Sequence, residues 1–269
     1  MYCAMNYTGS SCLNIYNKHP ETGDKPGYYR MNNNQWIYCN MTAVANGYIS
    51  TCAGIGGGWT RIANIDTNAG HGCPSGWQTG IQSGVNFCRQ PDSTHCVSAY
   101  FYTNGTSYQR VCGRARGYQK GATVAFYYGN HGGHSRTSYY ADGLLITRSS
   151  SYEHVWSYVA GYFDNHTQSS FNCPCAVGSG PTSPTFVDTN FYCESGAADV
   201  IDYTAYYLND PLWDRSGCFT SDCCNNPLQP WFFRQLSGVT SDYIQARICT
   251  GWNFGSSGIL IDQLELYIQ

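Results

Sequence analysis

The sequence predicts a mainly β fold with short helices, an α+β fold in a single disulfide-rich domain whose C-terminal half is rich in loops. Several short segments alternate apolar and polar residues, as the strands of a half-buried sheet do. The chain has 30 glycines, and turn signals such as Asn-Gly separate these segments from one another. Its 15 cysteines form no CxxC pair, which predicts disulfides that hold the irregular segments in place.

The chain begins with a segment that we expect to be an extended arm, residues 1–11. Residues 12–269 are expected to form one domain, because they contain no internal repeat and no linker. With 42% hydrophobic residues, the chain is able to bury a sizeable core. From Cys12 to about His19 the apolar residues have helical spacing, so we predict a short helix there.

The segment from Trp36 to Met41 is expected to be a strand with Trp36 and Tyr38 on one face and Ile37 and Cys39 on the other. Three glycines, 56–58, then precede a second strand that starts at Trp59. Glycine permits positive φ and close backbone approach, so this spacing predicts a tight contact in which the Trp59 ring fills part of the core.

These pieces resemble the start of fibrinogen-like domains. The matching motifs follow Cys12 and are Gly27-Tyr28-Tyr29, Tyr38-Cys39-Asn40-Met41 and Gly56-Gly-Gly-Trp-Thr60. The likeness covers about residues 12–77, and it is shared by intelectins, which are secreted lectins with a fibrinogen-like start. The resemblance implies a fibrinogen-like or intelectin-like domain and a disulfide between Cys12 and Cys39.

A polar loop follows the second strand, with oxygen-bearing side chains at Asn64, Asp66 and Asn68 before Gly70. Alternating oxygen ligands before a glycine turn suit a hard cation, and the intelectin likeness implies calcium here. One carboxylate is too few for such a site, so a late-region carboxylate such as Asp188 is expected to contribute. The alternative is an Asx-rich turn without metal.

The middle and the end of the chain are expected to be strands. Asn104-Gly105 is a strong hairpin signal between the first two of these segments. We also expect the strand ending at Thr147 to pair with the strand starting at Val155. The predicted strands are residues 97–102, 108–118, 124–128, 139–147, 155–162, 244–249 and 264–268.

Between about residues 165 and 231 the chain is irregular and rich in cysteine, aromatic and acidic residues. Trp213 lies between two aspartates, and binding residues concentrate in loops on a rigid scaffold. The intelectin paired-histidine stretch has no counterpart here, because the comparable stretch is Asn172-Cys-Pro-Cys175. The predicted ligand site consists of Tyr207, Asp210, Trp213, Asp214 and Trp231. The alternative is that the Trp213 ring packs in a small core within the loop itself.

Composition restricts the class of protein. Only 12% of residues are charged and the net charge is −3, so nothing favours nucleic acid or an anionic membrane as a partner. No apolar run approaches the length of a membrane span. The disulfides and four sequons predict a secreted glycoprotein. The predicted glycosylation sites are Asn6, Asn40, Asn104 and Asn165.

Two functions fit these features. The first is a secreted lectin that binds extracellular glycans or glycoproteins, with Ca²⁺ as its cofactor. The alternative is a structural or adhesive extracellular-matrix protein, favoured by the Tyr and Gly content and by the odd cysteine count, which leaves one thiol free or paired with another chain in a homo-oligomer. No catalytic motif is present, and we expect no enzyme.

Overall fold

The computed structural model describes residues 5–23, 25–42, 52, 56–82, 85–89, 91, 96–119, 143–148, 151–161, 185–186, 188, 190–195, 231–249 and 259–269. Within these residues the protein is mainly β with short helices, as predicted. The elements are β1 (Met5–Gly9), α1 (Cys12–Lys18), the 3-10 helix η1 (Pro20–Thr22), β2 (Gly27–Met31), β3 (Trp36–Asn40), β4 (Trp59–Asp66), β5 (Gln78–Gln82), β6 (Val85–Arg89), β7 (Cys96–Phe101), β8 (Tyr108–Gln119), β9 (Gly143–Arg148), β10 (Ser151–Gly161), β11 (Phe191–Ser195), β12 (Trp231–Thr240), β13 (Ile244–Cys249) and β14 (Ile259–Ile268).

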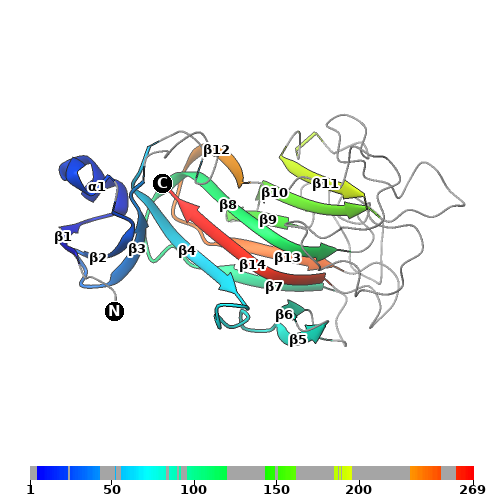
Figure 1. The fold of residues 1–269 in the computed structure, drawn as a ribbon. Coiled ribbons are helices and arrows are strands. Elements are labelled where there is room, and N and C mark those ends of the chain that lie inside the picture. The colour runs from blue at the N-terminus through cyan, green and yellow to red at the C-terminus, as the bar shows by residue number, and fades with distance from the viewer. Residues whose placement is uncertain are drawn as a thin grey trace, which may run out of the picture.

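The described strands form two sheets (Figure 1). The larger sheet runs β1-β2-β3-β4-β14 and continues through β6 to β5, while β8 pairs with β14 and with β12. Strand β14 is its centre, because it pairs antiparallel with β4, β6 and β8. The smaller sheet has the order β11-β10-β9-β13-β7. The last strand of the chain therefore joins the N-terminal part of the larger sheet to its middle part.

The two sheets share one hydrophobic core, which makes this part of the molecule a sandwich. Trp156 of β10 stacks on Phe232 of β12 with ring centroids 4.6 Å apart. Burying one aliphatic side chain stabilises the fold by roughly 1.5–3 kcal/mol, so this core is the main source of stability. Its fully buried aliphatic members include Val111, Leu264, Leu266 and Ile268 from the larger sheet and Leu144, Ile146 and Ile244 from the smaller one.

The strand pairing confirms one sequence prediction and corrects another. Strands β9 and β10 are antiparallel neighbours, as expected. The turn at Asn104-Gly105 is also present, with φ of 52° and 80° and a hydrogen bond from Thr106 N to Thr103 O. The predicted hairpin is wrong, because β7 pairs with β13 and β8 pairs with β12 and β14. The turn therefore carries the chain from one sheet to the other.

The N-terminal residues build a small lobe at one end of the larger sheet (Figure 1). Residues 5–9 of the expected arm form β1, which pairs in parallel with β2. Ser11 caps α1 by accepting a hydrogen bond from Asn14 N at 3.1 Å. The helix covers one face of β2 and β3, where Cys12 forms the disulfide to Cys39. The buried members of this lobe are Cys12, Ile15, Tyr29, Met31, Cys39 and Met41.

The three glycines before β4 permit the close contact that the sequence predicts. A Cβ on Gly57 would lie 2.0 Å from the carbonyl oxygen of Met41, and one on Gly58 would lie 2.8 Å from Leu13 Cα. Gly58 also has a φ of +89°, which favours glycine. Trp59 is 1% exposed, and its Nε1 donates to the carbonyl oxygen of Gly56 at 3.1 Å. Its ring is therefore part of the core, as predicted.

A buried histidine gives the fold a pH dependence. His154 in β10 is 3% exposed, and its Nε2 lies 2.9 Å from Ser157 Oγ. Burial, with a smaller contribution from the charge of Arg234, lowers the pKa of His154 to about 3. The unfolded chain takes up this proton near pH 6.5, whereas the folded protein does so only near pH 3. Stability is therefore fully present above about pH 6.5 and is lost as the pH falls toward 3, by at most ~1.4 kcal/mol per pH unit.

We predict that His154→Gln removes this loss, since glutamine keeps a polar group beside Ser157 and takes up no proton. Between pH 7 and pH 5 the wild type should lose about 1–2 kcal/mol more unfolding free energy than the variant, measured by denaturant titration. Ser107→Ala, on an exposed residue that does not titrate, is the control and should lose as much as the wild type. Equal losses in wild type and His154→Gln would contradict the assignment.

Candidate functional site

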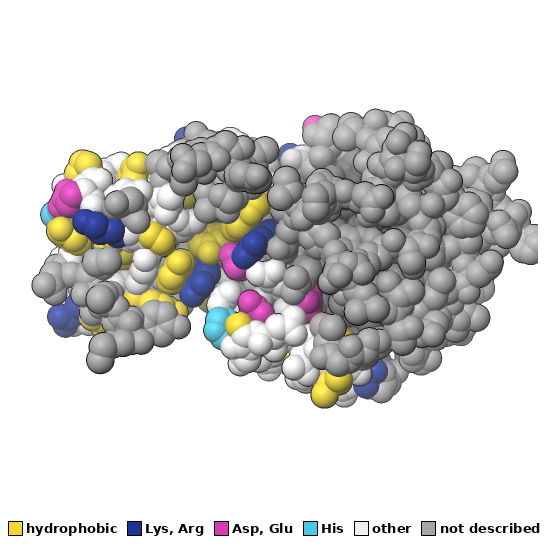
Figure 2. Space-filling view, in the orientation of Figure 1, with side chains coloured by type: hydrophobic (Ala, Val, Ile, Leu, Met, Phe, Trp, Pro, Cys, Tyr) yellow, Lys and Arg dark blue, Asp and Glu magenta, His cyan; other side chains and the backbone are white. Residues whose placement is uncertain are grey.

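The described residues include a groove of about 220 Å³, lined by β2, β3, β4 and the turn after β7. We call it the aromatic groove. Figure 2 shows hydrophobic side chains gathered in a band over β3 and β4, bordered by Lys and Arg side chains. The band is where the N-terminal lobe meets the middle of the sheet. The polar and aromatic residues that line the groove are Tyr28, Trp36, Tyr38, Thr60, Arg61, Asn64, Tyr102, Thr103 and Asn104.

The β2–β3 hairpin provides the aromatic floor. Its register places Tyr28 opposite Tyr38, and Arg30 opposite Trp36. Side chains alternate along a strand, so these four residues share one face, while Tyr29 points into the lobe core on the other. The Tyr28 and Tyr38 rings meet edge to face at 5.4 Å. The alternation of Trp36 and Tyr38 is the part of this site that the sequence predicts.

Arg61 of β4 extends this row of aromatic side chains. Its guanidinium lies 3.8 Å from the centroid of the Tyr38 ring, and its Nη2 donates to Tyr28 Oη at 3.3 Å. Such stacking fixes the plane of the guanidinium and leaves other N–H groups to donate. In the described part of the chain the ion pairs are His19–Glu21 and Arg114–Glu265, so Arg61 has no carboxylate partner there.

The groove is also lined by residues from a distant part of the sequence, the turn after β7. Tyr102 is 65% exposed and contacts Tyr243 edge to face, with centroids 5.8 Å apart. Thr103 anchors the turn by donating from Oγ1 to the carbonyl oxygen of Ser241 at 2.7 Å. Trp36, which also lines the groove, is 50% exposed. Two large aromatic side chains therefore face solvent beside one groove.

Beneath and beside the groove is a rigid cluster of buried side chains, Cys52, Trp59, Cys112 and Tyr267, which we call the Trp59 cluster. Tyr38 packs against it, so the floor of the groove rests on this core. Phe233 meets Trp59 edge to face at 6.2 Å. The disulfide between Cys52 and Cys112 crosslinks the cluster.

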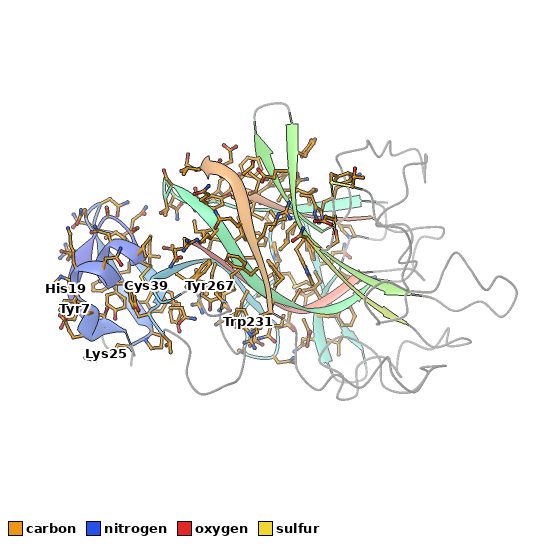
Figure 3. The ribbon with its side chains drawn as sticks, turned by 90° about the horizontal axis from the view of Figure 1, so that it is seen from above. Tyr7, His19, Lys25, Cys39, Trp231 and Tyr267 are labelled. Atoms are coloured by element: carbon orange, nitrogen blue, oxygen red, sulfur yellow. A yellow bond between two sulfur atoms is a disulfide. The ribbon has the colours of Figure 1, made fainter. Side chains whose placement is uncertain are left out.

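Trp231, a residue of the predicted ligand site, packs at the edge of the Trp59 cluster (Figure 3). It is half-buried, its ring lies 6.1 Å from Tyr267, and Arg114 lies 5.0 Å above it. Arg114 in turn pairs with Glu265 at 2.8 Å, and Tyr267 Oη donates to the same carboxylate at 3.1 Å. Burial and this carboxylate raise the pKa of Tyr267. Trp231 is thus a packing residue in this conformation and does not line the groove.

The other members of the predicted ligand site, Tyr207, Asp210, Trp213 and Asp214, lie outside the described residues. The ligand site in the irregular late region therefore stays a prediction. The sequence does not predict the groove, because its members Tyr28, Arg61 and Tyr102 are far apart in the chain. The sequence pattern that points to the groove is the alternation that places Trp36 and Tyr38 on one face of a strand. This strand is followed by the glycine segment 56–58.

The loop predicted to hold calcium uses its side chains within the loop and the sheet. Asp66 Oδ1 accepts from Ala69 N at 3.0 Å, and Asn68 Nδ2 donates to Asp262 Oδ2 at 3.3 Å. Asn64 Nδ2 and His71 Nδ1 are 2.6 Å apart. These contacts match the Asx-rich turn that was the alternative. Asp188 lies on the short described piece before β11, and no group of three His, Cys, Asp or Glu side chains that would hold a metal occurs among the described residues.

The predicted glycosylation sites differ in accessibility. Asn104 is exposed at a turn, which is a suitable position for a glycan. Asn40 is 7% exposed and its Oδ1 accepts from Thr42 N at 3.2 Å, so its side chain is far less accessible than that of Asn104. The side chain of Asn6 and all of Asn165 lie outside the described residues.

A possible serine–histidine pair is present but closed to substrate. Ser157 is 0% exposed beside His154, and His154 Nδ1 has no hydrogen-bond partner to orient it. A catalytic pair needs an accessible nucleophile and a third group that holds the base. The pair is therefore structural in this conformation.

No described helix is long and apolar enough to span a membrane.

No protein-family model matches the chain, and comparisons with curated proteins and with solved structures gave no match. The resemblance to fibrinogen-like domains and intelectins therefore stays a prediction from the motifs at residues 12–77. The fold stands as a mainly β protein crosslinked by disulfides, three of which join described residues.

Proposed function

We propose that the protein binds extracellular glycans through the aromatic groove. The observation that carries this proposal is the pair of exposed rings, Trp36 and Tyr102, which line one groove together with polar side chains. Sugars present an apolar face of C–H groups and a rim of hydroxyls. Aromatic rings suit the first, and the amide of Asn64 together with Arg61 suits the second.

The groove is small and firmly supported. Its volume of about 220 Å³ is below the range of roughly 300–1,000 Å³ typical for drug-sized ligands, so it suits one sugar unit of a larger chain. The floor rests on the Trp59 cluster and its disulfide, so little conformational entropy is lost on binding. The disulfides are compatible with an extracellular protein.

The proposal is tested on a glycan array with the secreted protein, with and without a chelator. Binding of a subset of glycans is the expected result. Binding that persists with the chelator would remove calcium from the proposal, while loss of binding would support the calcium prediction. Failure to bind any glycan, together with concentration-dependent self-association in sedimentation experiments, would favour the adhesive or structural alternative.

A further inference from the structure

We propose that the aromatic groove selects anionic sugars, that is, sugar units carrying a carboxylate or a sulfate. This inference rests on the proposed glycan binding and specifies the ligand class. It starts from the charges on the outer face of the β2–β3–β4 part of the larger sheet.

The groove holds a guanidinium that the fold has oriented without neutralising it. Arg61 is restrained by the Tyr38 ring at 3.8 Å and by Tyr28 Oη at 3.3 Å. Both partners are uncharged aromatic side chains, and no ion pair of Arg61 occurs among the described residues. A guanidinium presents its N–H groups in a planar fork that matches the oxygens of a carboxylate or sulfate.

A second cation lies on the same face. Arg30 is exposed and stands opposite Trp36 in the β2–β3 register, and in the described part of the chain it too has no ion pair. The carboxylate of Glu265, on the same face of the sheet, is engaged by Arg114 and Tyr267. Arg61 is the charged side chain among the residues that line the groove, so this lining is positive, although the whole chain has a net charge of −3. An anionic sugar has the complementary charge, and a neutral sugar uses only the aromatic rings.

The test compares matched neutral and anionic probes by isothermal titration. The probes are lactose, sialyllactose and sulfated lactose, with a hyaluronan hexasaccharide and its carboxyl-reduced form as a second backbone. The wild type should bind at least one anionic probe about tenfold more tightly than its neutral counterpart, because a hydrogen bond to a charged group contributes more than a neutral one. The sialylated and sulfated arms show whether a carboxylate or a sulfate is preferred.

Three variants locate the preference. Arg61→Gln should abolish it, and Arg30→Gln, which changes an exposed side chain and leaves the fold intact, should reduce it about threefold. Lys18→Gln removes the same charge from α1, on the opposite face of β2 and β3, and should leave the preference unchanged. Melting temperatures are recorded for each variant, so that an unfolded Arg61→Gln is recognised and Arg30→Gln then decides.

The outcomes separate this inference from the function beneath it. Equal binding of neutral and anionic probes, or a preference that survives both arginine substitutions, would overturn the anionic selectivity and leave glycan binding in place. Binding of other neutral glycans with no binding of any anionic probe would overturn it as well. If no glycan of any kind binds, the proposed function itself fails.

Discussion

Trp59→Ala is expected to lower the free energy of unfolding by about 3–5 kcal/mol, among the largest effects of any single substitution in the described part of the chain. Trp59 is 1% exposed and contacts Phe233, and its Nε1 donates to Gly56 O. The neighbouring disulfide and the backbone of the glycine segment hold the walls apart. The cavity left by the ring is therefore expected to stay open, which adds to the lost transfer free energy.

The control for this prediction is Trp36→Ala in the same sheet. Trp36 is 50% exposed, so its removal should change the unfolding free energy by no more than about 0.5 kcal/mol. Denaturant titration monitored by far-UV circular dichroism measures both variants. A loss below ~1 kcal/mol for Trp59→Ala would show that the Trp59 cluster is not a core.

Removal of the Cys52–Cys112 disulfide is expected to cost about 4 kcal/mol in the chain-entropy model, since it closes a long loop. The two cysteines are 60 residues apart, against 27 for Cys12–Cys39 and 15 for Cys73–Cys88. Both sulfurs of Cys52–Cys112 are also buried in the Trp59 cluster. The double alanine variant of this pair should therefore lose more stability than the double variant of either other pair.

The three double variants serve as controls for one another, because each removes one crosslink and two sulfur atoms. The predicted order of stability loss, from thermal unfolding under oxidising conditions, is Cys52–Cys112, then Cys12–Cys39, then Cys73–Cys88. If the Cys52–Cys112 variant were the most stable of the three, the role of this disulfide as the support of the groove would be refuted.

Local patterns were sufficient for the elements whose structure depends on neighbours in sequence. The helix at Cys12, the burial of Trp59 after its glycines and the shared face of Trp36 and Tyr38 follow from spacing and from backbone sterics. Strand β13 has the bounds that alternation predicts, Ile244–Cys249. These features are fixed within a few residues of chain.

Features that depend on distant segments were not predictable in this way. The Asn104-Gly105 turn has the geometry of a hairpin turn, yet its two flanking strands pair with β13 and with β14, whose sequences lie far downstream. The groove has the same origin, because Tyr102 reaches Trp36 and Arg61 only after the strand order is set. Strand β12 lacks strict alternation at its start, Trp231-Phe-Phe, so its pairing with β8 had no local signal.

Two tryptophan variants show whether ligand binds in the aromatic groove. The glycan that binds best on the array is titrated against Trp36→Ala and Trp213→Ala, each with a wild-type melting temperature as a condition of the comparison. Trp36→Ala should weaken binding about tenfold or more, since it removes an exposed ring from the groove, while Trp213→Ala should bind within about twofold of the wild type. Wild-type affinity for Trp36→Ala with loss of binding for Trp213→Ala would rule out binding in the groove and place the site in the late region of the chain.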